Sequence, residues 1–237
     1  MWTAPMIGLL VLAAAASTIA AWLLAVVRLG RTGGTALALV VGGVVAGDYG
    51  LAIRPWHLRW GATDEELTRA MPGDDLLAGS GSATRAITIA ATPEEIWPWL
   101  IQLRYGRAGW YSYDWIDNDF RASADRVVPE LQDLQVGDRI LMMPGMGFVV
   151  RSIDEPRAIV SLLEDGSTSW CLGLSPQGDG TTRLVSRWRP HFERSLATWL
   201  MLLLVEPGTF VMEQKMLRTL RDRVEAANLT AKQTAGP

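Results

Sequence analysis

No charged side chain occurs between residues 5 and 27 of this chain, which read PMIGLLVLAAAASTIAAWLLAVV. A helix needs about 20 apolar residues to cross roughly 30 Å of hydrocarbon, so this run predicts a transmembrane helix. A cleaved signal peptide is the competing interpretation, because the alanine-rich middle resembles a processing site. We favour a retained helix, since no positive charge precedes the run and the run is longer than a signal core.

A second apolar run, Thr35 to Ile53, is interrupted only by Asp48. It predicts a second span, joined to the first by the loop RLGRTGG as a hairpin. Arginines after this run outnumber those in the loop, which favours both termini in the cytoplasm by the positive-inside rule. The stretch RPWHLRW that follows carries Trp56 and Trp60 among cationic residues, a pattern typical of anchoring in the headgroup layer.

Composition excludes several classes of function. The 237 residues have a net charge of -3, so there is no basic footprint and nucleic acid is not expected as a partner. The single cysteine, Cys171, excludes an internal disulfide and a cysteine zinc cluster. Only His57 and His191 remain as histidines, so we predict neither a metal site nor a cofactor.

Residues 61–83, GATDEELTRAMPGDDLLAGSGSA, are acidic and rich in Gly and Ser. Such a segment buries little apolar surface, so it is interpreted as a linker with one helical turn near Asp64 to Ala70. The predicted organisation has four parts: a transmembrane hairpin with an interfacial segment at 1–60, an acidic linker at 61–83, a folded domain at 84–228 and a disordered tail at 229–237.

The stretch TPEEIWPWL predicts a helix start after the strand-like run TRAITIA. Thr92 is a suitable N-cap, and Pro93 occupies the first helical position, where its missing N–H costs nothing. Pro98 lies beyond the first turn and should kink the helix. We therefore expect Trp97 and Trp99 to point in different directions.

Five short runs after residue 136 are separated by turn signals such as Asp165-Gly166 and Asp179-Gly180. This spacing predicts five hairpin-linked strands. From Ser195 the pattern becomes helical, and Pro207 with Gly208 is expected to kink or break the helix. The first half of that helix is apolar all round, but ten residues are too few for a third span, so a domain helix is favoured.

Four segments together resemble the SRPBCC superfamily, which comprises START, Bet v 1 and polyketide-cyclase-like helix-grip proteins. They are TPEEIWPWLIQL, GWYSYDW, LQDLQVGDRI leading into MMPGMGF, and FVMEQKMLRTLRDR. RPWHLRWGATDEE is similar to the preamble of membrane-anchored bacterial members. The resemblance implies an α+β helix-grip fold, a curved antiparallel sheet around a long C-terminal helix, after the transmembrane hairpin. It also implies residence in a bacterial inner membrane, and a sixth strand near Val127 to Leu134 unless that strand is absent.

The resemblance implies an apolar cavity between sheet and helix, since family members hold lipids, sterols or polyketides there. Arg187 and Trp188 alternate on the last strand, so one of them faces inward; burial preferences favour Trp188, whereas Arg187 would pair with a ligand carboxylate or phosphate. The candidate cavity residues are Trp97, Trp99, Trp110, Tyr111, Tyr113, Trp115, Trp170, Arg187, Met212 and Met216.

Three hypotheses of function follow. The first is membrane-tethered binding of an apolar or amphipathic small molecule, lipid or polyketide-like. The second is a cyclase or dehydratase acting on an apolar substrate, which needs a buried carboxylate or His191 at the cavity. The third is a ligand-free scaffold with membrane or protein contacts. We predict no catalytic residue, because the candidate acids are interpreted as surface groups: Asp114, Asp117, Asp119, Asp125 and Glu130.

Overall fold

The computed structural model describes residues 22, 24, 26–30, 32–44, 47–77, 81–191 and 195–234. The chain divides into two compact units, Met1–Trp56 and His57–Pro237. The division falls at the end of the second predicted span.

One helix among the described residues, Thr32–Leu58, is long and apolar enough to cross a membrane, with a mean hydropathy of 1.9. It contains the π-helical turn η1 (Tyr49–Ile53) and ends in α2 (Arg54–Leu58). It covers the second predicted span, and it qualifies by length and composition only, as a signal sequence also can. The first predicted span, residues 5–27, lies mostly outside the described residues, so a two-helix hairpin is not shown.

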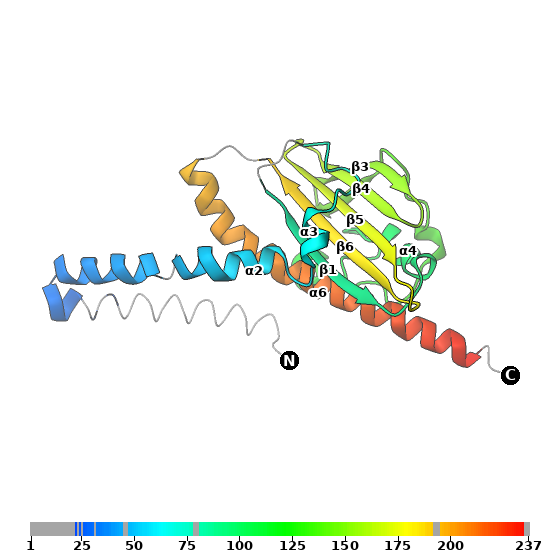
Figure 1. Ribbon diagram of the computed structural model, residues 1–237, viewed down its shortest axis with the longest axis horizontal. Coiled ribbons are helices and arrows are strands. Elements are labelled where there is room, and N and C mark those ends of the chain that lie inside the picture. Colours follow the sequence, from blue (N-terminus) through cyan, green and yellow to red (C-terminus); the bar gives the residue numbers. More distant parts are fainter. Residues whose placement is uncertain are drawn as a thin grey trace. The chain divides into compact units, whose positions relative to one another are not determined.

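The second unit contains a six-stranded antiparallel sheet in the order β1-β6-β5-β4-β3-β2. The sheet curls into a half-barrel around the long helix α6 (Figure 1). All five strands predicted after residue 136 are confirmed, but residues 127–134 hold the short 3-10 helix η2 (Pro129–Leu131) instead of a further strand. The strands are β1 (Ala83–Ile89), β2 (Arg139–Met143), β3 (Met146–Asp154), β4 (Ala158–Leu163), β5 (Thr168–Pro176) and β6 (Thr182–Pro190).

Helix α4 (Pro93–Ile101) begins as the sequence predicts. The Thr92 hydroxyl accepts a hydrogen bond from the Glu95 amide, and the Glu95 carboxylate accepts one from the Thr92 amide at 2.8 Å. This reciprocal capping box fixes where the chain leaves β1 and enters the helix. Pro98 lies inside α4, which ends three residues later at Ile101.

Helix α6 (Leu196–Thr234) continues through Pro207, so of the two expected outcomes at this position, a kink or a break, the break is wrong. The proline removes one backbone hydrogen bond, and a helix of 39 residues with a buried face compensates for that loss. The helix also extends into the predicted tail, of which only residues 235–237 lie outside the described part. Its buried apolar face comprises Phe210, Met216, Leu217, Leu220 and Val224.

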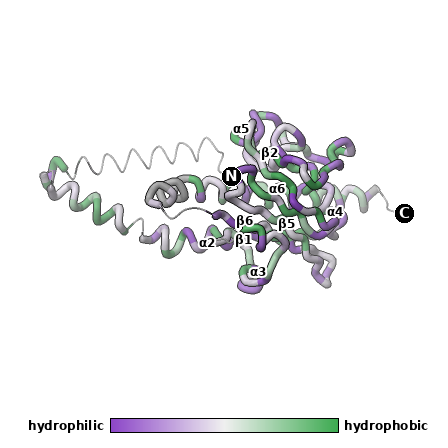
Figure 2. The backbone as a smooth tube through the Cα atoms, turned by 90° about the horizontal axis from the view of Figure 1, so that it is seen from above, coloured by the Kyte–Doolittle hydropathy of each residue, from purple (hydrophilic) through white to green (hydrophobic). Residues whose placement is uncertain are grey.

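Residues 57–77, here called the strap, cover the outer face of the sheet. Arg183 on β6 pairs with Glu66 at 2.7 Å, and Arg187 pairs with Asp74 at 2.7 Å. Glu66 lies in the short helix α3 (Asp64–Thr68), on the side of the sheet opposite to α5 (Asp114–Asp117) (Figure 2). The linker interpretation of residues 61–77 is corrected here, because Glu66 and Asp74 pair with arginines of the sheet. The other acidic residues of this segment, Asp64, Glu65 and Asp75, are exposed.

Candidate functional site

The concave face of the sheet is built by alternate residues of neighbouring strands. In β5 and β6, Trp170 lies opposite Trp188, and Leu172 lies opposite Ser186. Because successive strand residues point to opposite faces, Cys171 and Arg187 lie on the outer face beneath the strap. Burial under the strap raises the pKa of the Cys171 thiol to about 12.

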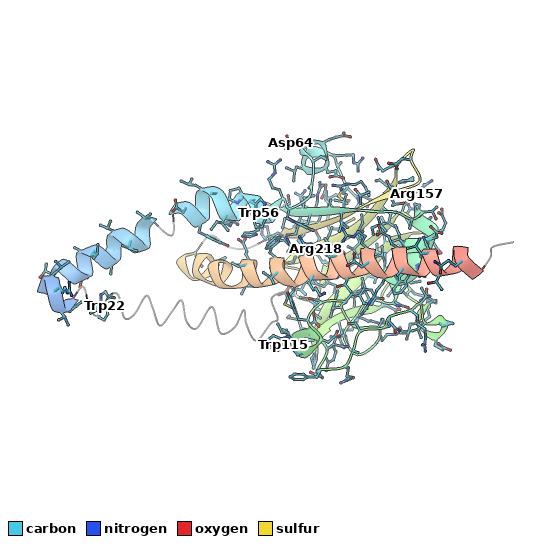
Figure 3. The ribbon with its side chains drawn as sticks, turned by 90° about the horizontal axis from the view of Figure 1, so that it is seen from below. Trp22, Trp56, Asp64, Trp115, Arg157 and Arg218 are labelled. Carbon is cyan, nitrogen blue, oxygen red and sulfur yellow. The ribbon has the colours of Figure 1, made fainter. Side chains whose placement is uncertain are left out.

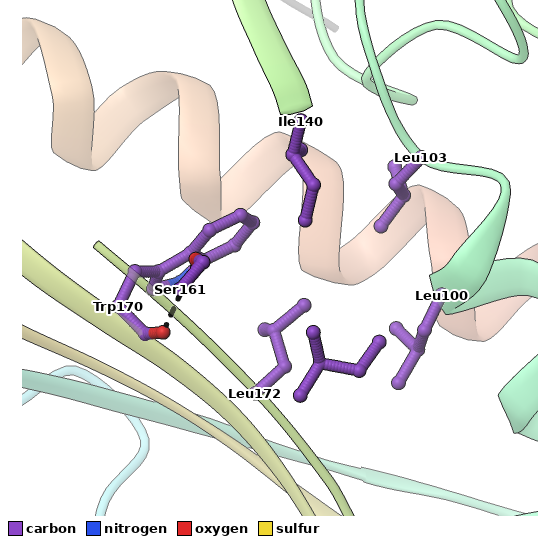
Figure 4. A pocket seen from close by; sticks show the side chains of 7 residues that line it. Leu100, Leu103, Ile140, Ser161, Trp170 and Leu172 are labelled. Carbon is purple, nitrogen blue, oxygen red and sulfur yellow. Dashed lines mark hydrogen bonds between the residues drawn. The ribbon is translucent and has the colours of Figure 1, made fainter. Parts of the chain in front are cut away.

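The concave face, α4 and the loop after it enclose an apolar space (Figure 4). The volume of this space that the centre of a water molecule can reach is about 0 Å³, so the space is too narrow for water. The Ser161 hydroxyl in the lining donates to the Trp170 carbonyl at 3.3 Å. The lining residues are Leu100, Leu103, Ile140, Ile159, Ser161, Trp170 and Leu172.

The candidate cavity residues include six rings between residues 97 and 115, and none of these six lines the apolar space. Trp97 and Trp99 are buried in the core, and the Trp99 and Tyr111 rings pack edge to face at 6.0 Å. The Tyr111 hydroxyl is hydrogen-bonded to Gln102 at 2.6 Å, and burial raises its pKa to about 12. These rings fill the interior because α4 and the 105–112 loop pack directly against each other, at the density usual for protein cores.

The remaining candidates divide between the interior and the surface. Trp170 and Met216 are buried in the core cluster, and Tyr113 and Met212 are half-buried. Trp115 is 43% exposed at the domain surface (Figure 3). Arg187 is corrected to the outer face, where it donates to Asp74 and to the carbonyls of Glu66 and Arg69, while Trp188 faces inward as burial preferences favour.

An aromatic row lines the interior next to the apolar space. The Trp170 ring stacks on Trp188 at 5.0 Å and lies 5.8 Å from Trp110, and Phe148 packs at 5.6 Å from Trp170. The Trp110 Nε1–H is buried and has no hydrogen-bond partner among the described residues. An unpaired buried donor costs about 1 to 3 kcal/mol, so an acceptor placed beside Trp110 would be stabilised.

A buried polar cluster occupies the other end of the row, centred on Glu213 of α6. Its carboxylate accepts hydrogen bonds from Ser186 and from Trp188 Nε1 at 2.9 Å, and it forms an ion pair with Arg85 of β1. The Trp170 Nε1–H donates to Ser186 at 2.9 Å, which connects this cluster to the apolar space. Arg85 also donates to the carbonyl of His57 at 2.9 Å and lies over the Phe210 ring.

The cluster can hold charge in the interior, but its geometry does not provide a free base. Both Glu213 oxygens accept hydrogen bonds, and Glu213 does not line the apolar space, so its carboxylate is not presented to a guest there. His191 is exposed and not at the interior. The described residues contain no group of three or more potential metal-ligating side chains.

Glu213 and Arg85 were not predicted from the sequence, although their spacing from apolar residues indicates that both lie on buried faces. Glu213 follows Phe210 by three residues and precedes Met216 by three, so it shares the buried face of α6. Arg85 alternates with Ile87 and therefore shares the buried face of β1. One charge of each sign on two apolar faces indicates a buried ion pair.

Asp117, in α5, is the second buried carboxylate of this region. Among the described residues neither of its oxygens has a hydrogen-bond partner. Burial, and to a smaller extent the charge of Asp114, raise the pKa of the Asp117 carboxyl to about 6. The nearby Ser112 hydroxyl partly offsets this rise in pKa. That hydroxyl donates its hydrogen bond to the Met212 carbonyl. Asp117 is thus 7% exposed, and the interpretation of it as a surface group is corrected.

We expect Asp117→Asn to change how stability depends on pH. In the unfolded chain the carboxyl ionises near pH 4, and in the folded chain near pH 6, so folding is favoured by the proton. Stability of the wild type should therefore fall by about 2 kcal/mol as pH rises from 4 to 6. The stability of Asp117→Asn should not decrease over this pH range, so at pH 7 the variant should be more stable than the wild type. Thermal unfolding of the full chain at several pH values measures this difference. The exposed Asp125→Asn is the control; an unchanged pH slope in Asp117→Asn would contradict the assignment.

Comparison with known proteins gives similarity of fold only. No protein-family model matches the sequence, and no curated protein matches it. A solved structure of CalC, a self-sacrificing resistance protein from Micromonospora echinospora, is 18% identical, with a TM-score of 0.42, over 62% of this chain and 95% of that one. A Polyketide_cyc-like protein from Corynebacterium glutamicum is 14% identical, with a TM-score of 0.33, over 66% and 96%. An AHSA1-like protein from Aeromonas hydrophila is 18% identical, with a TM-score of 0.34, over 62% and 94%. These values carry no statement about a ligand or an activity of this chain.

Proposed function

We propose that this chain is a membrane-tethered helix-grip protein that binds an apolar or amphipathic small molecule, lipid or polyketide-like, between the concave sheet, α4 and α6. The described conformation is the closed form of the domain, and entry of a ligand displaces side chains that line the apolar space. The tether comprises the helix Thr32–Leu58 together with residues 5–27 as the other half of a hairpin. A domain on the cytoplasmic side of the bilayer would take its ligand from the membrane without exposing it to water.

The observation that carries this proposal is an apolar space with no room for a water molecule. Apolar spaces too narrow for water leave their lining atoms without contact partners, and an apolar guest supplies those contacts. Trp110 does not line the space, but its ring lies 5.8 Å from that of Trp170, which does. A ligand that displaces Trp170 could therefore bring a hydroxyl or carbonyl group to the unpaired Trp110 Nε1–H. A mostly apolar enclosure with few polar groups suits an amphipathic molecule.

Mass spectrometry of small molecules extracted from the purified full chain tests the proposal. We expect the wild type to retain an apolar compound at up to one equivalent, and Leu103→Phe to retain at least tenfold less, because the ring fills the space. Leu229→Phe adds the same bulk at a site that is 62% exposed and should retain as much as the wild type. Equal retention by Leu103→Phe and the wild type would contradict binding in this space.

A ligand-free scaffold is the second candidate, and the packing of the interior favours it. The space has about 0 Å³ for a water molecule, and the rings of Trp97, Trp99 and Tyr111 fill the rest of the interior. If the domain is a ligand-free scaffold, neither the wild type nor either variant should retain a compound. A cyclase or dehydratase has no comparable support, since neither buried carboxylate, Glu213 or Asp117, lines the apolar space.

A further inference from the structure

Exposed apolar side chains gather on two neighbouring segments of the domain. Trp115, Ile116 and Phe120 belong to α5 and the turn after it, and Phe120 is 81% exposed. Met143 and Met146 form the turn between β2 and β3 and are also exposed. These five residues are called the apolar rim below.

The two segments of the rim are connected to each other and to α6. Tyr105 donates its amide to the Leu141 carbonyl of β2 at 2.9 Å, and its hydroxyl donates to Asp119 in the α5 turn. The Ser112 hydroxyl, just before α5, donates to the Met212 carbonyl of α6 at 3.0 Å. The rim therefore lies at one end of the domain, where α6 reaches Met212.

The register of the sheet shows that the chain passes from β6 into α6 at this same end of the domain. Met143 pairs with Met146 at the β2–β3 turn, and Thr168 pairs with Pro190, after which the chain leads to α6. Glu213 contacts Ser186 and Trp188, near the end of β6. Helix α6 begins 17 residues before Glu213, about 25 Å along its axis, whereas β6 ends four residues past Ser186, about 13 Å. The apolar start of α6 thus projects past the sheet, as Figure 1 shows.

The second unit begins at this same end, at His57, where the candidate membrane span ends. The span ends at Leu58, and the ring of His57 packs against Phe210 of α6 at 5.4 Å, less than a turn from Met212. The Trp60 ring packs against the same Phe210 at 6.4 Å. The point at which the chain leaves the candidate span is therefore at the end of the domain that carries the rim.

The backbone at Phe120 adopts an unfavourable conformation, and its ring is exposed. Asp119 and Phe120 have φ values of 51° and 61°, a region that bulky residues rarely adopt, and Phe120 donates its amide to the Asp114 carbonyl at 2.8 Å. Such strain costs on the order of 1 to 3 kcal/mol and persists where the surroundings impose it. The ring gains little burial from the protein in return.

We propose that the apolar rim inserts into the interfacial layer of the phospholipid bilayer that holds the span; this inference rests on the membrane tether of the proposed function. Aromatic and aliphatic side chains partition into this layer by burying apolar area. The rim holds acidic as well as basic neighbours, Asp119 and Arg121 among them, so insertion is expected to depend little on salt or on anionic lipid. The bilayer would then press on the same loop that packs against α6 through Ser112.

The test places a fluorescent label on the rim of the full chain in phosphatidylcholine nanodiscs. Ile116→Cys carries an environment-sensitive nitrobenzoxadiazole label, and Gly178→Cys, in the β5–β6 turn at the opposite end of the sheet, is the control. Cys171 is buried with a raised pKa and should not react. We expect brominated lipid to quench the label at 116 at least threefold more than the label at 178. Equal quenching, or quenching that appears only as protein concentration rises, would overturn the inference.

A second variant separates insertion from a structural role of the ring. Phe120→Gly removes the ring and relieves the positive φ, so thermal stability should stay the same or rise while quenching of the label at 116 falls by half or more. A loss of stability with unchanged quenching would overturn the proposal. Flotation of the wild type with liposomes tests the membrane tether separately. If the chain floats but the label at residue 116 is not quenched, only this inference is contradicted. If the chain does not float, the tether is contradicted.

Discussion

Glu213→Ala is expected to destabilise the domain by about 3 to 5 kcal/mol, because it leaves the Arg85 guanidinium buried without its counter-ion. The substitution also removes the acceptor for Ser186 and for the Trp188 indole. For a domain of this size such a loss lowers the midpoint of thermal unfolding by about 10 °C. Differential scanning calorimetry of the full chain in detergent measures it.

Two further variants separate charge from hydrogen bonding at this site. Glu213→Gln keeps an acceptor for Ser186 and Trp188 but still leaves Arg85 unpaired, so it should remain markedly destabilised. The double variant Arg85→Met with Glu213→Leu removes both charges and should recover more than half of the loss. Asp222→Ala, on the exposed side of α6, is the control and should cost less than about 1 kcal/mol. If Glu213→Ala costs no more than Asp222→Ala, the buried pair does not support the fold.

Arg187→Ala is expected to release the strap from the sheet and to cost about 3 to 4 kcal/mol. Arg187 is 3% exposed and donates to Thr84, Asp74 and two strap carbonyls, so its loss leaves several buried acceptors unpaired. The strap should then open locally before the domain unfolds. We expect limited proteolysis between residues 61 and 77 to accelerate at least tenfold.

Arg189→Ala is the matched control for this prediction. Arg189 lies on the same strand and pairs with the same Asp74, but at 3.3 Å and with a side chain that is 26% exposed. It should change stability by less than about 1 kcal/mol and leave the proteolysis rate of the strap unchanged. Equal proteolysis of the two variants would show that the strap is held by other contacts.

Local patterns predicted the elements of the domain well, because their causes are local. Thr92 and Glu95 form the capping box that starts α4, and the glycine turns separate the five later strands where expected. The strap was interpreted as a linker because its composition is polar. Its order comes from Arg183 and Arg187, more than 100 residues away, which no local pattern reports.

The candidate site was predicted less well, for a related reason. Aromatic content shows that rings gather near residues 97–115, but not whether they border an open space or fill one. Here Trp99 and Tyr111 fill it, and the remaining space lies among aliphatic residues such as Leu100 and Leu103. Arg85 and Glu213 form an ion pair in the interior. This pair can be predicted only when each residue is assigned to the apolar face of its own strand or helix.

Methyl NMR of the leucine side chains during titration with 1-octanol tests most directly whether the interior admits an apolar guest. We predict saturable shifts of the Leu100, Leu103 and Leu172 methyl signals, which line the space, and none for the exposed Leu76 and Leu229. The Leu103→Phe variant should lose the shifts at Leu100 and Leu172. Shifts confined to Leu76 and Leu229, or no saturable shift at any leucine of the space, would contradict ligand binding in this domain.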